Sequence, residues 1–314
     1  MIALLSAPSN LGLRPPQPGA VPGTAKAPEA LREAGLHRRL EAVGAVDAGV
    51  VLPGRYVDDD ATRPRGWVRN EAALIEHARR LAARLRALRA EGRVPLVLGG
   101  DCSLLVGIGV ANAAGERAGL VHVDGHTDFR HPGGRDPVAS VAGEDLAAAI
   151  GLHTAAVSDI DGVAPYFDRH RTVHIGCRDD DEDLDEVRAA LADVVPASEV
   201  LAVGAEAVAA RVRRVMGGTP YWLQLDVDVL DPSVMPAVDS PDPGGLTAAA
   251  LVDLLRALAP AAIGASVTVF DPDLDPDGGL AALLADVLVE GLGRLGAGTP
   301  EPAAASSEAL RRER

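Results

Sequence analysis

The chain has 314 residues, of which 47% are hydrophobic and 3% aromatic, which suits one large α/β domain with a core built mainly from Ala, Val and Leu. Its net charge of −15 argues against nucleic acid and anionic membranes as partners, because phosphate binding needs clustered Lys and Arg. No apolar run approaches the about 18 residues of a membrane span, and no signal peptide is visible. The only cysteines, Cys102 and Cys177, make no disulfide framework, so we expect a reduced, cytoplasmic protein.

Short apolar strands alternate with helices along the chain. In chain order we expect a strand ending at Leu4, a helix over 28–35, a strand over 46–51, a helix from Asn70 as N-cap to about 92, strands over 94–98 and 119–124, a helix over 145–152, a strand over 172–176, helices over 183–192 and 205–216, a strand over 221–226, a helix over 247–258, a strand over 262–270 and a helix over 279–295. This alternation predicts a parallel sheet covered on both faces. We expect one domain over residues 1–295 and a disordered tail over 296–314, which lacks an apolar period.

Acidic side chains follow two of the predicted strands. Asp124, His126 and Asp128 stand at alternate positions after an apolar run, and Asp226 and Asp228 repeat the spacing further along. In an extended backbone, residues two apart share one face. In a parallel sheet, sites form beyond the carboxyl ends of the strands. We therefore expect these five side chains to converge.

Five hard nitrogen and oxygen ligands from two strand ends favour a metal site, and a pair of ions would suit that number of carboxylates. Either motif alone could be a loop with solvated acids or a capped turn. Together, without a cation, the carboxylates would repel one another and destabilise the fold. The sequence thus predicts a metal centre, with two ions as the favoured arrangement.

Three segments carry a resemblance to a known family. Gly99-Gly100-Asp101-Cys102-Ser103 is similar to GGDHS, Asp124-Gly125-His126-Thr127-Asp128 is similar to DAHxD, and the stretch from Asp226 through Asp228 to Gly244-Gly245-Leu246-Thr247 is similar to S-x-D-x-D-x-x-D-P…GGLT. These are motifs of the ureohydrolases, which include arginase, agmatinase and formiminoglutamase. Weaker matches near residues 23–32 and 175–179 extend the resemblance over all but the tail.

The resemblance implies a three-layer α/β/α fold, a small-molecule substrate, a homo-oligomer (trimer or hexamer) and two divalent metal ions, most simply Mn²⁺, bridged by a hydroxide. It assigns the metal ligands to the positions of Cys102, Asp124, His126, Asp128, Asp226 and Asp228. It also implies that Asp128 receives the proton of the attacking hydroxide and passes it to the leaving amine. One acid after the fifth strand, best matched by Asp181, would contact a substrate amino group.

Cys102 departs from the family, which has a histidine ligand there. As a thiolate ligand it would shift the preference toward Zn²⁺ or Fe²⁺, and a bound metal would hold it deprotonated. It could instead be a buried apolar thiol. A third alternative, a covalent nucleophile, needs a base and an oxyanion hole.

Two further departures concern the substrate and the proton path. Val269 stands where arginase and agmatinase carry a glutamate that grips the guanidinium, and Val cannot pair with a cation. Ala142 stands where arginases carry a proton-shuttling histidine, for which His131 or Glu144 could substitute; Glu144 could also contact the substrate. An ordinary loop histidine is the favoured interpretation of His131.

The sequence therefore predicts a metal-dependent hydrolase of linear C–N bonds in an amidino-type group: formimino, ureido, N-hydroxyguanidino or guanidino. Its products would be an amine plus urea, a urea analogue or formamide. The alternative is a pseudoenzyme or binding protein with the same fold, suggested by Cys102, Val269 and Ala142 together. A deacetylase-like amide hydrolase is a lesser alternative, since that group lacks the GGDxS and GGLT elements.

Overall fold

One sheet of eight parallel strands organises the computed structural model, which describes residues 1–115, 117–135 and 137–298. The strands are β1 (Ile2–Ala7), β2 (Val46–Val50), β3 (Val94–Gly99), β4 (Gly119–Val123), β5 (Thr172–Ile175), β6 (Asp193–Val195), β7 (Tyr221–Asp226) and β8 (Ala262–Thr268), in the order β2-β1-β3-β8-β7-β4-β5-β6. Every strand pairing is parallel. Central strands such as β4 and β7 are buried along their whole length, as a sheet covered on both faces requires.

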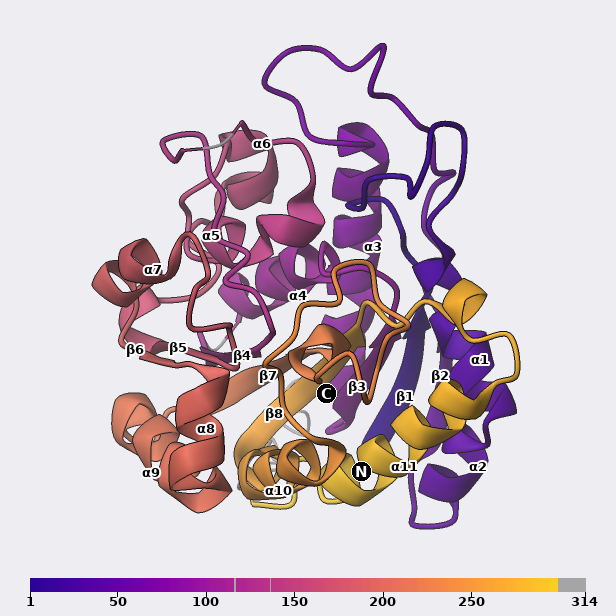
Figure 1. Ribbon diagram of the computed structural model, residues 1–314, viewed down its shortest axis with the longest axis vertical. Coiled ribbons are helices and arrows are strands. Elements are labelled where there is room, and N and C mark those ends of the chain that lie inside the picture. Colours follow the sequence, from indigo (N-terminus) through magenta and orange to yellow (C-terminus); the bar gives the residue numbers. More distant parts are fainter. Residues whose placement is uncertain (116, 136, 299–314) are drawn as a thin grey trace, which may run out of the picture.

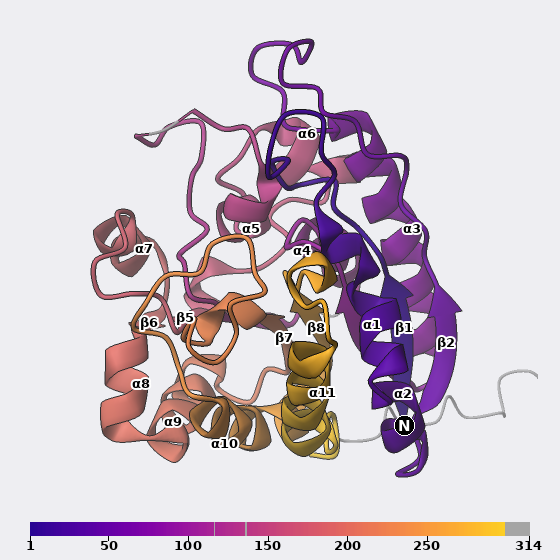
Figure 2. The ribbon, with the colours of Figure 1, turned by 45° about the vertical axis from the view of Figure 1, so that its right-hand side comes forward.

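Helices cover both faces of this sheet, which confirms the predicted α/β/α fold (Figure 1). They are α1 (Ala27–Glu33), α2 (Leu36–Glu41), α3 (Glu71–Ala90), α4 (Leu104–Ala113), α5 (Asp145–Ala149), α6 (Ala155–Ser158), α7 (Leu184–Ala190), α8 (Ala197–Val203), α9 (Ala205–Met216), α10 (Ala248–Leu258) and α11 (Gly279–Leu292). Helices α1, α2 and α8–α11 contribute to one hydrophobic cluster, and α3–α7 to the other. Figure 2 shows β1 between α1 and α3, which lie on opposite faces of the sheet.

Several predicted elements agree closely with the structure. Helix α9 and strand β7 have the predicted bounds, and the other predicted elements differ mainly at their ends. Strand β6 and helices α2, α6 and α8 were not predicted, and neither was helix α4. Its residues are apolar on all sides because it is buried between α3 and the sheet, so it lacks the amphipathic period that marks a surface helix.

Asn70 occupies the expected N-cap position of α3 but makes no capping hydrogen bond. Its backbone is left-handed, with φ of 49°. Its side chain instead accepts a hydrogen bond from the Val57 amide at 2.8 Å and donates one to the Leu11 carbonyl at 3.2 Å. Asn70 therefore ties two long loops together. Both loops lie beyond the strand ends, at the top of Figure 1.

The core contains mostly aliphatic side chains, as the low aromatic content predicts. Among the described residues, Tyr166, Phe129, Phe167 and Phe270 are the largest fully buried side chains. No helix in the described part of the chain is long and apolar enough to cross a membrane. The predicted tail begins at residue 296, and its residues 299–314 lie outside the described ones.

Candidate metal centre and active-site cavity

The carboxyl ends of β3, β8, β7 and β4 are neighbours in the sheet. Asp124 directly follows β4, Asp226 ends β7, and Cys102 follows β3 after a tight turn. The turn needs glycine, since a Cβ on Gly100 would lie 1.6 Å from the Ser9 carbonyl oxygen. This arrangement brings side chains from distant parts of the chain to one edge of the sheet, where parallel sheets hold their sites.

Three groups of potential ligands lie within reach of a common ion. Within each group the ligand atoms are no more than 4.8 Å apart; the groups are Cys102/Asp124/Asp226, Cys102/Asp128/Asp145 and Asp124/His126/Asp228. The six side chains assigned by resemblance therefore lie together. Asp145 lies with them, although the sequence did not indicate it as a ligand. The only available signal was an acid at the start of an otherwise apolar helix.

The expected geometry of the segment after β4 is wrong in one respect. The strand ends at Val123, and Asp128 has a left-handed backbone with φ of 47°, so the segment is not extended. The Asp124 carboxylate accepts a hydrogen bond from the His126 amide at 2.7 Å, which closes a turn. The three side chains meet because the chain turns, and not because they alternate along a strand.

His126 and Asp228 form the paired part of the cluster. His126 Nδ1 lies 2.8 Å from Asp228 Oδ2, and the Gly125 amide donates to Asp228 Oδ1 at 3.0 Å. Burial opposes the charged form of His126, but the bond and charge of Asp228 raise its pKa to about 10. Burial likewise acts to raise the pKa of Asp228, yet His126 and the Gly125 amide hold that pKa below its usual value. A bound metal would have to displace a ring proton to use His126 as a ligand.

Cys102 lies beneath the cavity in a polar environment. It is fully buried, its thiol donates to Asp226 Oδ2 at 2.6 Å, and its sulfur is 3.0 Å from Thr268 Oγ1. Burial, followed by the charge of Asp226, raises the pKa of Cys102 well above its usual value. The thiol is therefore protonated in this arrangement, which is poor for a nucleophile but compatible with a ligand that loses its proton to an incoming metal.

The ionised form of the remaining carboxylates is unfavourable in the absence of a cation. Burial, with repulsion from neighbouring acids, raises the pKa values of Asp124, Asp128 and Asp226 well above the usual range. Asp124 Oδ2 is buried and accepts no hydrogen bond. Clustered oxygen donors with an unpartnered atom suit a divalent cation, which would relieve both the repulsion and the missing hydrogen bond.

Two buried histidines lie behind the cluster. His122 Nε2 is 3.8 Å from Asp124 Oδ2, and His122 Nδ1 is 3.0 Å from His174 Nδ1. Burial lowers the pKa of His122 to about 3, so its ring is neutral. The position of His122 behind Asp124 suits a residue that supports a ligand.

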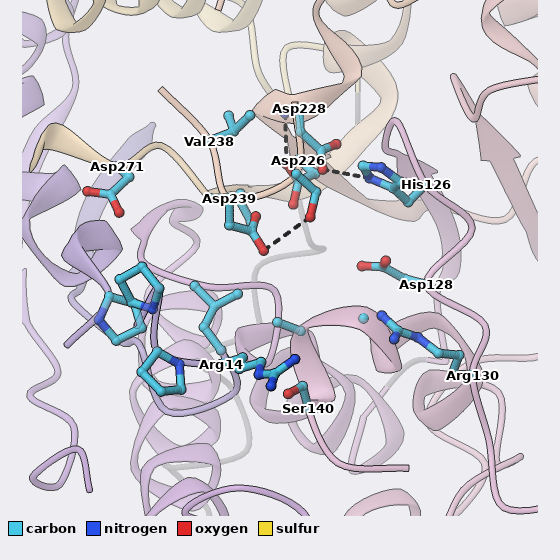
Figure 3. Close-up of a pocket in the computed structure, with 18 of the residues that line it drawn as sticks. Arg14, His126, Asp128, Arg130, Ser140, Asp226, Asp228, Val238, Asp239 and Asp271 are labelled. Atoms are coloured by element: carbon cyan, nitrogen blue, oxygen red, sulfur yellow. Dashed lines mark hydrogen bonds and ion pairs between the residues drawn. The ribbon is translucent and has the colours of Figure 1, made fainter. Parts of the chain in front are cut away.

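A cavity of about 590 Å³ opens above the cluster (Figure 3). Its wall includes His126, Asp128, Asp226 and Asp228 from the cluster, Arg14 from the loop after β1, Arg130, Ser140 and Ala142 from the loop after β4, Asp181 after β5, Asp239 after β7, and Val269 and Asp271 after β8. Asp128 and Asp239 project toward the central space in Figure 3. The cavity thus has a substrate-sized volume above the candidate metal ligands.

Two residues predicted to contact substrate are also loop anchors. Asp181 lines the cavity and accepts hydrogen bonds from the Thr127 amide at 2.9 Å and hydroxyl at 2.7 Å. Glu144 is 2% exposed, accepts bonds from two loop amides and lies 2.9 Å from His153 Nε2. Substrate contacts by Asp181 and Glu144 stay predictions. His131 pairs with Glu186 at 2.9 Å and is not part of the cavity wall.

Comparisons with known proteins bear on this site. A model of the arginase family matches residues 2–293. The chain belongs to the arginase family. It is 34% identical to an arginase from Bacillus caldovelox over 72% of this chain and 77% of that protein. It is 30% identical to a guanidinopropionase from Pseudomonas aeruginosa, over 70% of this chain and 67% of the relative.

Solved structures agree with this family. The native Bacillus caldovelox arginase superposes with a TM-score of 0.82 at 28% identity, covering 93% of this chain and 97% of the other. Proclavaminate amidino hydrolase from Streptomyces clavuligerus gives 0.69 at 25% identity, covering 95% and 92%. The recognition of a ureohydrolase from its motifs is confirmed, and so is the prediction of a hydrolase: this arginase-family member is an enzyme of the ureohydrolase type.

Proposed function

We propose that this arginase-family hydrolase uses two divalent metal ions to cleave a linear C–N bond in an amidino-type group of a small molecule. The products are an amine plus urea, a urea analogue or formamide. One observation carries the proposal: Cys102, Asp124, His126, Asp128, Asp226 and Asp228 form overlapping clusters of ligand atoms at neighbouring strand ends. Four of these side chains also line the cavity above.

These six residues would hold the metal. Mn²⁺ is the ion we expect first, since most of the donors are carboxylate oxygens; Zn²⁺ or Fe²⁺ would suit the thiol of Cys102. Bound divalent cations supply a hydroxide nucleophile at neutral pH and stabilise negative charge on the reacting group. The residues of the chain bind the substrate and transfer the proton.

Asp128 is the residue we assign to proton transfer. Its carboxylate is partly exposed on the cavity wall, while Asp124 is buried below it. It can therefore accept a proton from the nucleophile and deliver it to the leaving amine. Ala142 lines the cavity at the position of the arginase histidine and cannot take part in that transfer.

The substrate end of the cavity supports an uncharged or differently held group. Val269 is 3% exposed, lines the cavity and has φ of 76°, a strained value for a β-branched residue. A guanidinium keeps its charge at any working pH. Burying it against Val269 without a carboxylate would cost several kcal/mol, on the order of the penalty for an unpaired ion. A ureido group is neutral and avoids this penalty. Formimino and N-hydroxyguanidino groups are weaker bases than a guanidine, so they lose their charge at a smaller cost.

A second candidate substrate class is a guanidino acid. Asp239 also lines the cavity, where the surrounding walls and the charge of Asp228 raise its pKa to about 6 although its side chain is exposed to the cavity. Arg14 and Arg130 line the same cavity and form no ion pair within the described residues. In Figure 3 they lie across the space from Asp226 and Asp228. Asp239 could pair with a guanidinium and an arginine with the distal carboxylate, and two relatives are named guanidinopropionase and guanidinobutyrase.

The test is a substrate panel on metal-reconstituted protein, with urea, ammonia and formamide each measured. We expect weak activity on arginine and agmatine and better activity on formimino, ureido or N-hydroxyguanidino compounds. Efficient urea release from arginine, with kcat/KM of about 10⁴ M⁻¹s⁻¹ or more, would contradict the argument from Val269. Activity confined to guanidino acids and lost in Asp239→Asn would select the second class.

The pseudoenzyme alternative gains nothing from the comparisons, whose relatives are named as hydrolases. We further propose a cytoplasmic protein, supported by two free, buried cysteines, and a homo-oligomer of the trimeric or hexameric kind implied by the resemblance. Light scattering of the purified chain measures the second property directly.

A further inference from the structure

Asp145 is a buried acid that the family resemblance does not assign. It is the first residue of α5 and is fully buried. Neither of its carboxylate oxygens forms a well-shaped hydrogen bond, although the Leu146 amide and the Asp128 carboxyl lie close enough to affect it. A buried carboxylate without such bonds is costly, so its retention needs a physical reason.

The neighbours of Asp145 point to a ligand rather than to packing. A carboxylate oxygen of Asp145 lies within 4.8 Å of both the Cys102 sulfur and an Asp128 oxygen. The Ala147 amide of α5 bonds to the Asp128 carbonyl at 3.4 Å, which fixes the helix start beside this loop. No Lys or Arg within the described chain forms an ion pair with Asp145.

A second unpartnered group faces the same carboxylate. His122 Nε2 is buried, has no hydrogen-bond partner, and lies 3.5 Å from Asp145 Oδ1 and 3.8 Å from Asp124 Oδ2. If His174 donates from Nδ1 to His122 Nδ1 across their 3.0 Å contact, His122 carries its proton on Nε2. That proton faces both acids. His122 is then a positioning residue, which orients carboxylates toward an ion.

We propose that Asp145 is a metal ligand of this chain, adding a carboxylate beside Cys102 where the family relies on a histidine. The inference rests on the proposed metal centre and adds a residue to it. A carboxylate oxygen is a hard ligand that suits Mn²⁺, whereas the sulfur of Cys102 is a soft ligand that suits it less well. Asp145 therefore compensates for the departure at Cys102. It keeps the part of the site formed by Cys102, Asp128 and Asp145 able to bind a second ion.

The experiment is a Mn²⁺ titration of the metal-stripped full-length chain, followed by calorimetry and by electron paramagnetic resonance. We expect the unmodified chain to bind two ions that give a spin-coupled spectrum. Asp145→Asn keeps the shape of the side chain but removes its charge; we expect one of the two sites to weaken by at least tenfold, about 1.4 kcal/mol, and the coupled spectrum to give way to that of a single ion.

The matched control is Asp275→Asn. Asp275 is a nearly buried acid whose oxygens accept hydrogen bonds from the Leu280 and Ala281 amides at 3.1 and 2.7 Å, and it lies outside the ligand clusters. This variant should keep both ions. Binding of both ions by Asp145→Asn with unchanged affinities overturns the proposal, whatever happens to its activity.

A double variant tests the compensation itself. In the Cys102→His background, where the family ligand is restored, Asp145→Asn should weaken Mn²⁺ binding less than it does in the unmodified chain. Equal losses in both backgrounds would contradict compensation for Cys102.

Failure of a variant to fold leaves an independent measurement on the unmodified chain. Crystals grown with Mn²⁺ should show anomalous density with an Asp145 oxygen at a metal–ligand distance of about 2.0–2.3 Å. Two ions with Asp145 outside the coordination sphere would overturn this inference alone. No bound ion would overturn both the inference and the proposed metal-dependent function.

Discussion

The cluster of proposed ligands has two halves, one around His126 and Asp228 and one around Cys102, Asp128 and Asp145. They differ in how many of their charged groups have a partner within the protein. Around Asp228, His126 supplies a charged partner and the Gly125 amide a hydrogen bond. Around Cys102, Asp128 and Asp145 there is a protonated thiol, neighbouring acids and two carboxylate oxygens without partners. The half around His126 and Asp228 has its charges paired, whereas the acids around Cys102 repel one another when they are ionised, and a cation would relieve that repulsion. The departure from the family thus falls on the half that most needs metal.

Substitution of Asp226, which we propose as a metal ligand, should have the largest effect. Asp226 contacts Cys102 through one oxygen and accepts the Asp228 amide at 2.8 Å with the other, so it joins the two halves. Substitution of a residue that only orients a metal ligand can cost up to about 100-fold in metal affinity or activity. Because Asp226 is itself a proposed ligand, we expect Asp226→Asn to lose more than this. Metal content and turnover measure it. Asp242→Asn, which alters only the exposed contact of His126, serves as the control; equal losses in the two variants would contradict the assignment.

The tight turn that places Cys102 after β3 can be tested by a substitution at Gly100. A Cβ there would meet backbone atoms of Ser9, which cannot move aside, so we expect Gly100→Ala to lower the free energy of unfolding by about 2–4 kcal/mol. Gly115→Ala is the control, because a Cβ there meets nothing closer than 4.0 Å. Denaturant unfolding measures both variants, and similar stability for the two would refute the role of this turn.

Restoring histidine at position 102 should sharpen the contrast between the halves. Imidazole suits Mn²⁺ better than a thiol does, so Cys102→His should raise Mn²⁺ affinity at the weaker of two sites and leave the site of His126 and Asp228 unchanged. Stepwise calorimetric titration separates the two. Unchanged binding at both sites would mean that Cys102 is a packing residue.

The two halves should also respond to pH with opposite signs in the metal-free protein. The pKa of Asp128 is raised by burial and neighbouring acids above its ordinary 3.8, so its contribution to stability is present below that pH and is lost as pH rises through the folded-state pKa. Asp128→Asn should therefore stabilise the metal-free chain near pH 7 relative to the unmodified chain, with the difference vanishing near pH 3.

Asp228 gives the opposite expectation. Its pKa is lowered by His126, so its contribution is present above 3.8 and is lost as pH falls through the folded-state value. Asp228→Asn should destabilise the metal-free chain near pH 7. Denaturant unfolding at several pH values measures both variants; the same sign for the two would refute the distinction between the halves.

The sequence predicted seven of the eight strands, most of which are short, apolar and bounded by loops, but it missed the three-residue strand β6. The six residues that spacing and family resemblance assign as ligands lie together in the structure, and their binding of metal stays a prediction. The sequence could not predict α4, whose burial on all sides removes the amphipathic period. It also missed the left-handed backbone of Asp128 and the position of Asp145 beside Cys102 and Asp128. Both depend on how the loop after β4 folds back onto α5, which local patterns do not encode.

The most direct test of the account is the metal content of the purified, full-length chain after reconstitution with Mn²⁺, measured by mass spectrometry of the elements. The account predicts two equivalents per chain, bound at the cluster that joins Asp124, Asp226 and their neighbours. No bound metal after reconstitution with Mn²⁺, Zn²⁺ or Fe²⁺ would contradict metal-dependent hydrolysis and favour a pseudoenzyme with the arginase fold.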